Sequence, residues 1–257
     1  MKNSNIKKKI LIAIKNITKN KSKKLHEPIF MGNEKKYLNR CIDTGYVSYK
    51  GKFVTIFEKK IMKYTRSKFA VPTINGTSAL HILLKIYKIN SNHEVILPSI
   101  SFVAVANAVL YCNSKPNFVD SEMSTLGIDP YKLRNYLSKT TKIRNRKCIN
   151  KKTGKVIKAL IAVHVFGIPC KILELKKVCK EFNLILIEDA AEAIGSFYKG
   201  KHLGLFGDSA ILSFNGNKTI TSGGGGFILT KNKKIAKTAE HLTTTAKLKH
   251  KWEYIHD

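Results

Sequence analysis

The stretch LILIEDAAE, residues 184–192, is an apolar strand that runs straight into acidic residues. An uninterrupted apolar run of this length is typical of a strand buried on both faces of a parallel sheet. Asp189 closes the strand, where a carboxylate needs a partner because an unpaired buried charge is costly. Asp189 is therefore either the N-cap of a following helix or the counter-charge of a bound cationic group.

The rest of the chain repeats this alternation of short apolar strands and helical patterns. Strands are predicted at residues 69–72, 94–97, 116–120, 158–164, 184–188, 209–214 and 226–230, and helices at 32–44, 53–64, 79–89, 103–111, 130–137 and 172–182. A basic, hairpin-like stretch at 144–155 carries a turn signal at Thr153-Gly154. The order predicts an α/β fold with a mainly parallel central sheet flanked by helices. Ligands of such sheets lie beyond the carboxyl ends of the strands, so residues that directly follow strands are the functional candidates.

Two groups of candidates stand between a strand and a helix. Gly76, Thr77 and Ser78 precede a predicted helix, where backbone N–H groups and two hydroxyls suit a phosphate, although Ser and Thr are also ordinary N-caps. Phe102 follows the strand at 94–97, and its ring can stack on a planar ligand or belong to the core.

The third candidate lies in the turn SFNGNK, residues 213–218, which a run of four glycines follows at 223–226. A lysine in a turn rich in Gly and hydroxyl groups can reach into a cleft, where desolvation and nearby cations make an amine nucleophilic. In a chain so rich in lysine, a plain surface position for Lys218 is the alternative.

Taken together, in their order and spacing, these segments resemble the DegT/DnrJ/EryC1/StrS family of sugar aminotransferases from about residue 25 to the last residue. The motifs that carry the resemblance are NGTSALH (75–81), SFVA (101–104), EDAAEAIGS (188–196), GLFGD (204–208), SFNGNK (213–218) and TSGGGGF (221–227). With TGYVSYKGKFV (44–54) and HLTTTAK (241–247), the form SFNGNK is similar to the subgroup that aminates UDP-linked 4-keto-6-deoxy sugars in legionaminic and related acid pathways.

The resemblance implies a fold of the aspartate aminotransferase type (fold type I), a homodimer, and pyridoxal 5'-phosphate (PLP) as the cofactor. Lys218 would hold the cofactor as a Schiff base and move a proton during catalysis, and Asp189 would pair with the pyridinium nitrogen. Some relatives have His in place of this lysine and dehydrate sugars, so Lys218 favours amino transfer.

The resemblance also implies the residues that surround the cofactor. Thr77, Ser78 and Ser213 would bind its phosphate, and Gly76 would allow the backbone to approach it closely. Phe102 would stack on its ring. Glu192 matches the position that contacts the phenolic oxygen, where many relatives carry Gln or His. The resemblance implies no metal ligand.

The predicted function is the transfer of an amino group, from glutamate, to a nucleotide-linked 4-keto-6-deoxy sugar for cell-surface polysaccharide. Family members continue into a small C-terminal domain that begins with an Asn-Tyr-Arg stretch, and this chain ends before that stretch. We therefore expect residues 25–257 to form the PLP-binding large domain. An inactive remnant that keeps the fold without turnover is the alternative.

Residues 1–24 are expected to form a basic N-terminal helix and a joint. Ile10, Ile14 and Ile17 suit a short amphipathic helix, which we expect to dock on its own domain, with a membrane-surface helix as the alternative. No stretch approaches the roughly 20 apolar residues of a transmembrane helix.

The composition indicates which kinds of partner to expect and in which compartment the protein works. The formal net charge is +30, from 47 Lys and Arg against 17 Asp and Glu. The lysines are scattered, and neither an aromatic platform nor zinc spacing accompanies them, so no nucleic-acid partner is expected. Five Cys without CxxC spacing indicate neither a disulfide framework nor a zinc site, and predict a reducing cytoplasm.

Overall fold

The computed structural model describes residues 2–19, 26–49, 51–247 and 256. Its centre is a nine-stranded sheet, seven strands of which follow the order β1-β11-β10-β7-β6-β2-β3. These strands are β1 (Phe69–Thr73), β11 (Gly226–Thr230), β10 (Ser209–Ser213), β7 (Ile185–Asp189), β6 (Val156–Val163), β2 (His93–Pro98) and β3 (Lys115–Val119). The five strands from β10 to β3 are parallel, whereas β11 is antiparallel to both of its neighbours.

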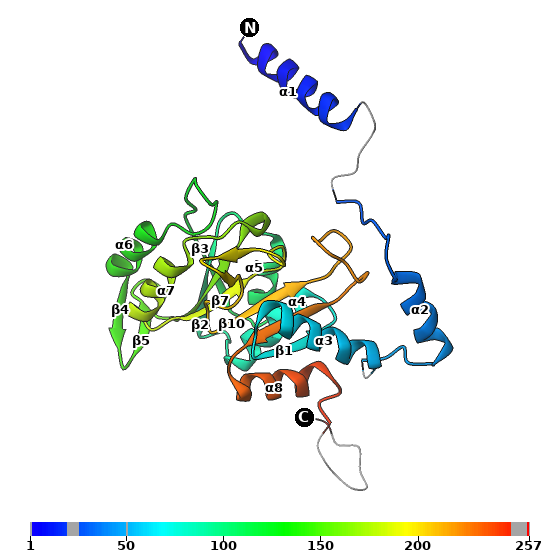
Figure 1. The fold of residues 1–257 in the computed structure, drawn as a ribbon. Helices are drawn as coiled ribbons and strands as arrows, with labels where there is room; N and C mark the ends of the chain where they lie inside the picture. Colours follow the sequence, from blue (N-terminus) through cyan, green and yellow to red (C-terminus); the bar gives the residue numbers. More distant parts are fainter. Residues whose placement is uncertain (1, 20–25, 50, 248–255, 257) are drawn as a thin grey trace.

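Helices cover both faces of this sheet, as Figure 1 shows. One face packs on α4 (Gly76–Ile86), α5 (Val103–Leu110) and α8 (Lys233–Thr243), and the other on α3 (Lys52–Thr65), α6 (Pro130–Thr140) and α7 (Ile172–Glu181). Alternate strand residues supply the two cores, so that Leu186 joins one core and Ile187 the other. The predicted α/β fold with a mainly parallel sheet between helices is confirmed.

Smaller elements complete the described chain. They are α1 (Lys2–Thr18), α2 (Glu34–Asp43), the hairpin of β4 (Thr141–Arg144) and β5 (Lys147–Asn150), the 3-10 turn η1 (Val165–Gly167), and the ribbon of β8 (Phe197–Tyr198) and β9 (Lys201–His202). The basic hairpin turns at Asn145 and Arg146, both with positive φ, and Gly154 forms the next turn, into β6. The turn signal at Thr153-Gly154 therefore marks the exit from the hairpin and not its tip.

One helix begins earlier than its sequence pattern predicts, and another is present that the pattern does not predict. Helix α4 begins at Gly76 and not at residue 79, because the side chain of Asn75 caps it by accepting the Ser78 N–H at 2.7 Å. Helix α8 was not predicted, although Asn232 caps it in the same way.

The N-terminal helix differs from its prediction in position. Figure 1 shows α1 apart from the body of the chain, and its isoleucines are 53–82% exposed. The expectation that this helix docks on its own domain is therefore wrong. None of the helices in the described ranges is long and apolar enough to cross a bilayer.

Candidate active site

A cavity of about 220 Å³ opens at the carboxyl ends of the parallel strands. Its walls come from the turn before α4, the start of α5, the end of β7 and the turn after β10. Six of the residues predicted from the sequence line it: Gly76, Thr77, Phe102, Asp189, Ser213 and Lys218. Segments that are more than 100 residues apart in the chain thus meet at one edge of the sheet, as the strand-end rule predicts.

Asp189 forms the deep wall of this cavity. It is the last residue of β7 and 8% exposed, and its Oδ1 accepts the backbone N–H of Ala191 at 3.0 Å. Burial raises its pKa, and the Ala191 N–H and the nearby Lys218 offset that effect in part. A cation placed against this carboxylate would relieve the cost of burying its charge.

Lys218 reaches into the same cavity from the turn after β10. Its Nζ donates to Glu192 Oε1 at 3.0 Å and lies 5.5 Å from the centre of the Phe102 ring. The lysine side chain is 11% exposed, so the surface position considered for it is wrong. Phe102 is 66% exposed at the N-cap of α5 and is not a core residue.

The first turn of α4 forms one wall of the cavity. A Cβ on Gly76 would lie 3.0 Å from the Cβ of Ser213, so a larger residue here would require the end of β10 to shift by a few tenths of an ångström. Thr77 lines the cavity, but Ser78 does not, and its backbone N–H is already bound by Asn75. Gly76, Thr77 and Ser213 are therefore better placed than Ser78 to contact a phosphate in this cavity.

Glu192 does not line this cavity but accepts a hydrogen bond from Lys218 beside it. It lines an adjoining hollow of about 280 Å³ together with His26, Phe166 and Lys218. Phe166 was missed by the sequence analysis, although its φ of 51° and 71% exposure are both unusual for a phenylalanine. Nothing in the local pattern VFG signals this backbone conformation.

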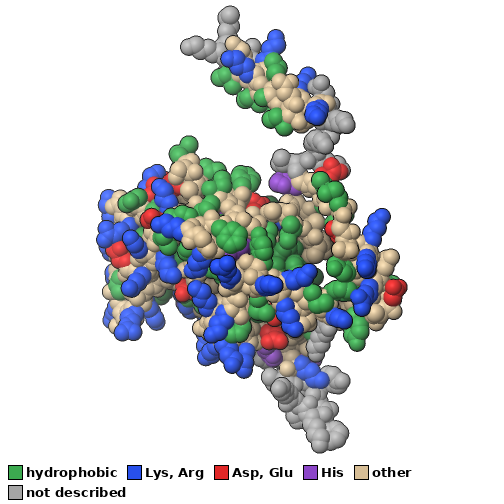
Figure 2. Space-filling model, in the orientation of Figure 1, with side chains coloured by type: hydrophobic (Ala, Val, Ile, Leu, Met, Phe, Trp, Pro, Cys, Tyr) green, Lys and Arg blue, Asp and Glu red, His purple; other side chains and the backbone are tan. Residues whose placement is uncertain are grey.

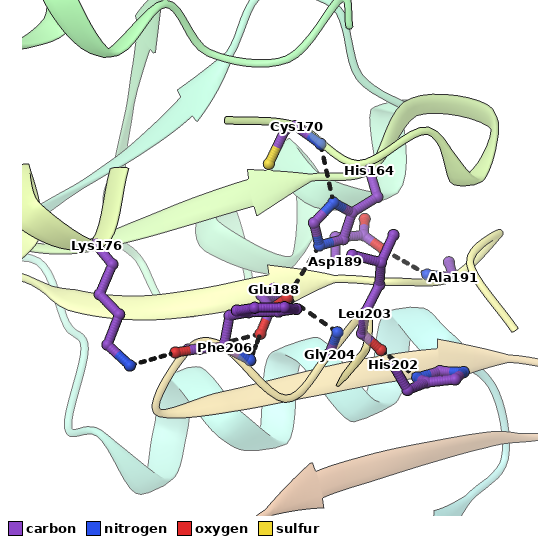
Figure 3. A network of polar contacts seen from close by, with 11 residues as sticks. His164, Cys170, Lys176, Glu188, Asp189, Ala191, His202, Leu203, Gly204 and Phe206 are labelled. Carbon is purple, nitrogen blue, oxygen red and sulfur yellow. Dashed lines mark hydrogen bonds and ion pairs between the residues drawn. The ribbon is translucent and has the colours of Figure 1, made fainter. Parts of the chain in front are cut away.

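A buried polar network lies on the opposite face of β7, and the sequence analysis missed it as well (Figure 3). His164 Nε2 lies 3.0 Å from Glu188 Oε2, and the Cys170 backbone N–H donates to His164 Nδ1 at 3.3 Å. This assigns the proton to Nε2, which donates to Glu188. Glu188 also accepts the backbone N–H groups of Gly204, Phe206 and Gly207 at 2.6–2.9 Å.

The residues present fit a phosphorylated, cationic, planar aldehyde. The helix start suits a phosphate, the exposed ring of Phe102 a flat ring, the buried Asp189 a ring cation, and the Lys218 amine a carbonyl carbon. The described residues contain no group of three or more His, Cys, Asp or Glu side chains that could hold a metal ion. Fold and cavity together agree with the class that the sequence resemblance implies, the PLP-binding large domain of the aspartate aminotransferase type of fold.

Comparison with known proteins narrows this class. The chain belongs to the DegT/DnrJ/EryC1/StrS aminotransferase family, whose pattern matches residues 29–257. It is 42% identical to a GDP-perosamine synthase of Vibrio cholerae over 205 residues, which cover 80% of this chain and 52% of the relative. It is 33% identical to the putative pyridoxal phosphate-dependent aminotransferase EpsN of Bacillus subtilis, covering 87% of this chain and 55% of that protein.

A solved structure gives the same answer for the fold. The aminotransferase from Psychrobacter cryohalolentis aligns with a TM-score of 0.77 at 26% identity, over 89% of this chain and 56% of the other. The predicted family and fold type, and PLP as the cofactor of the family, are confirmed. The chain spans about half the length of the curated relatives it matches.

Proposed function

We propose that this chain is the large-domain part of a PLP-dependent aminotransferase that transfers an amino group from glutamate to a nucleotide-linked 4-keto-6-deoxy sugar. The observation that carries the proposal is the position of Lys218, whose amine shares a cavity with Asp189, Gly76 and Ser213. The large domain is proposed to be residues 25–257, after an N-terminal helix and joint at 1–24.

Five residues of the cavity have a part in this proposal beside Lys218. Gly76, Thr77 and Ser213 would bind the phosphate and fix the position of the ring, against which Phe102 would pack. Asp189 would keep the ring nitrogen protonated. When bound, the cofactor supplies an aldehyde carbon and an electron-accepting ring.

Lys218 and Glu192 would carry the proton chemistry. Glu192 Oε1, which accepts a hydrogen bond from Lys218 Nζ at 3.0 Å, would take the proton that this amine must lose to hold the aldehyde carbon of a bound cofactor. With an amino-acid donor in place, the free amine of Lys218 would move a proton between the carbons of donor and cofactor. Positioned proton transfer of this kind contributes roughly 10²–10⁴-fold in rate.

The sugar is proposed to enter through the hollow beside Glu192. Phe166 stands exposed there and offers an aromatic face for a sugar or base. The subgroup resemblance favours a UDP-linked substrate, whereas the similarity to the GDP-perosamine synthase of Vibrio cholerae favours a GDP-linked one. Turnover of paired GDP- and UDP-linked 4-keto-6-deoxy sugars decides between them. We propose that the product serves cell-surface polysaccharide.

The assembly and the compartment belong to the same proposal. Helix α2 has no buried residue, and Tyr37, Leu38 and Ile42 on it are 45–70% exposed, which suits an apolar contact between two subunits of a homodimer. All five cysteines are free thiols, which fits a cytoplasmic enzyme.

The test is a cofactor titration followed by trapping. The chain with PLP should develop an absorption band near ~420 nm, and borohydride should then fix the cofactor on Lys218. Lys218→Ala should abolish the adduct, whereas Lys199→Ala, an exposed lysine, should leave it unchanged. Equal labelling of the Lys218→Ala chain contradicts the proposal.

A second measurement separates an enzyme from an inactive remnant. Adding glutamate to the loaded chain should remove the ~420 nm band as the amino group is transferred, because the lysine imine is lost. A chain that binds the cofactor at Lys218 but leaves the band unchanged with glutamate is the remnant, with the fold and without turnover.

A further inference from the structure

The candidate surface is an apolar stripe on α1. Ile6, Ile10, Ile14 and Ile17 are spaced four, four and three residues apart, which places them along one side of a helix. Each is 54–82% exposed. Lys8, Lys9 and Lys15 lie around the remainder of the helix. Figure 2 shows hydrophobic side chains mainly along one flank of α1 and Lys side chains on the other. Four exposed isoleucines in a row imply a binding surface.

The catalytic fold does not account for this helix. The family match begins at residue 29, after α1 has ended at Thr18. Figure 1 shows no element of the body lying against α1. The stripe therefore needs an occupant other than the core of its own domain.

Charge decides which kind of occupant fits. Residues 1–24 contain nine Lys and no Asp or Glu, so they account for +9 of the +30, and the rest of the chain carries +21. Docking on the body, or on the body of a second copy, would bring like charges together. Pairing with α1 of a second copy is disfavoured as well, because α1 holds about two heptads and no acidic residue to pair with the lysines.

Among anionic partners, the isoleucines favour lipid over nucleic acid. Lys by itself contacts nucleic-acid phosphates, but stacking on the bases uses aromatic side chains and Arg, and residues 1–24 contain neither. The surface of a bilayer can bind both sides of α1, because the apolar side chains lie at the acyl boundary and the Lys side chains contact anionic headgroups. We propose that α1 lies in the interface of an anionic lipid bilayer and attaches the aminotransferase fold to that surface.

The test is flotation of the full chain with two vesicle types, phosphatidylcholine alone and phosphatidylcholine mixed with phosphatidylglycerol. The chain should float only with the anionic vesicles. Ile10→Ser/Ile14→Ser/Ile17→Ser should weaken partitioning by about 100-fold, because the buried apolar area is lost. Lys8→Gln/Lys15→Gln should weaken it by about 30-fold, since each Lys near an anionic surface contributes separately.

Matched controls exist for both variants. Ile12 is 53% exposed but lies off the stripe, so Ile12→Ser should change partitioning by about twofold at most. Lys177→Gln/Lys180→Gln removes the same charge from exposed positions on α7 and should change it by less than about threefold. Unchanged thermal unfolding of all variants shows that the body remains folded.

Three outcomes overturn the inference. The first is equal flotation with neutral and anionic vesicles, or none with either. The second is binding to RNA or DNA that the serine substitutions do not weaken while vesicle binding is absent. The third is a change of oligomeric state in the serine variant without any change in flotation, which assigns the stripe to a contact between copies.

Discussion

Glu188 and Asp189 are adjacent carboxylates on β7 whose side chains point to opposite faces of the sheet. They differ in the number of hydrogen bonds they accept and in the direction in which their pKa is shifted. Glu188 is fully buried among donors: His164 Nε2–H and the backbone N–H groups at 204, 206 and 207. Burial alone would raise its pKa, but the hydrogen bond from His164 and the backbone donors hold the pKa below its usual value. Asp189 accepts from Ala191, and its pKa is raised by burial.

The difference separates a structural carboxylate from one that is prepared for a ligand. Four donors satisfy the Glu188 charge, and together they tie β6, β7 and the loop before β10 to one another. Asp189 faces a cavity with its charge under-satisfied, which is the arrangement expected where a cationic ligand completes the site. Substitutions at the two positions should therefore have opposite consequences.

The largest expected effect is on amino transfer. Asp189→Asn should lower its rate by about 10³-fold, because the amide cannot hold a ring nitrogen in its protonated form. Unfolding of the cofactor-free chain should change by less than about 1 kcal/mol, since the substitution removes a poorly satisfied charge. Stopped-flow absorbance with glutamate and urea unfolding measure the two quantities. Asp120→Asn, on the exposed surface, is the control, and a loss of stability in Asp189→Asn as large as that in a Glu188 variant would erase the contrast.

Substitution on the other face should act on folding. Glu188→Gln should destabilise the chain by about 3 kcal/mol, because the amide NH₂ would face the backbone N–H donors and leave buried groups unpaired. Glu181→Gln, which breaks an exposed pair with Arg134, should cost less than about 1 kcal/mol. Urea unfolding at neutral pH measures both, and equal costs would show that the Glu188 network does not support the fold.

The pH dependence of stability should distinguish the two carboxylates further. A depressed pKa means that the Glu188 charge stabilises the fold above the ordinary value of 4.5 and that this stability is lost as the pH falls through its lower folded pKa. The raised pKa of Asp189 has the opposite sign, so its charge costs stability above 3.8 and the cost disappears as the pH falls. The gap between wild type and Glu188→Gln should thus shrink in acid, and any gain from Asp189→Asn should shrink too. Urea unfolding over a series of pH values measures both, and a gap that widens in acid would reverse the assignment.

The residues that line the cavity could be predicted from the sequence, whereas the buried network on the opposite face of β7 could not. Asp189 ends β7 and Lys218 lies in the turn after β10, so their position at the sheet edge follows from chain order and topology. The pairing of His164 with Glu188 depends on the register that sets Ala162 opposite Glu188, which a single sequence does not reveal. The family resemblance assigned Ser78 to the phosphate, and the sequence pattern did not reveal that Asn75 caps the helix through the Ser78 N–H.

The smallest expected effect concerns Phe166, two residues beyond His164. Its left-handed backbone and exposed ring both cost stability, a combination that is typical of residues kept for binding. Phe166→Gly should raise stability by about 1 kcal/mol, because glycine adopts φ near 51° without strain and the lost ring is not a core contact. Lys199→Gly, at φ 48° on the exposed ribbon, should gain a similar amount. Only Phe166→Gly should also raise KM for the keto sugar, by about tenfold for a lost aromatic stacking contact. If stability rises and KM is unchanged, the strained backbone of Phe166 does not serve substrate binding. The ligand-binding residues would then be those of the cavity around Asp189.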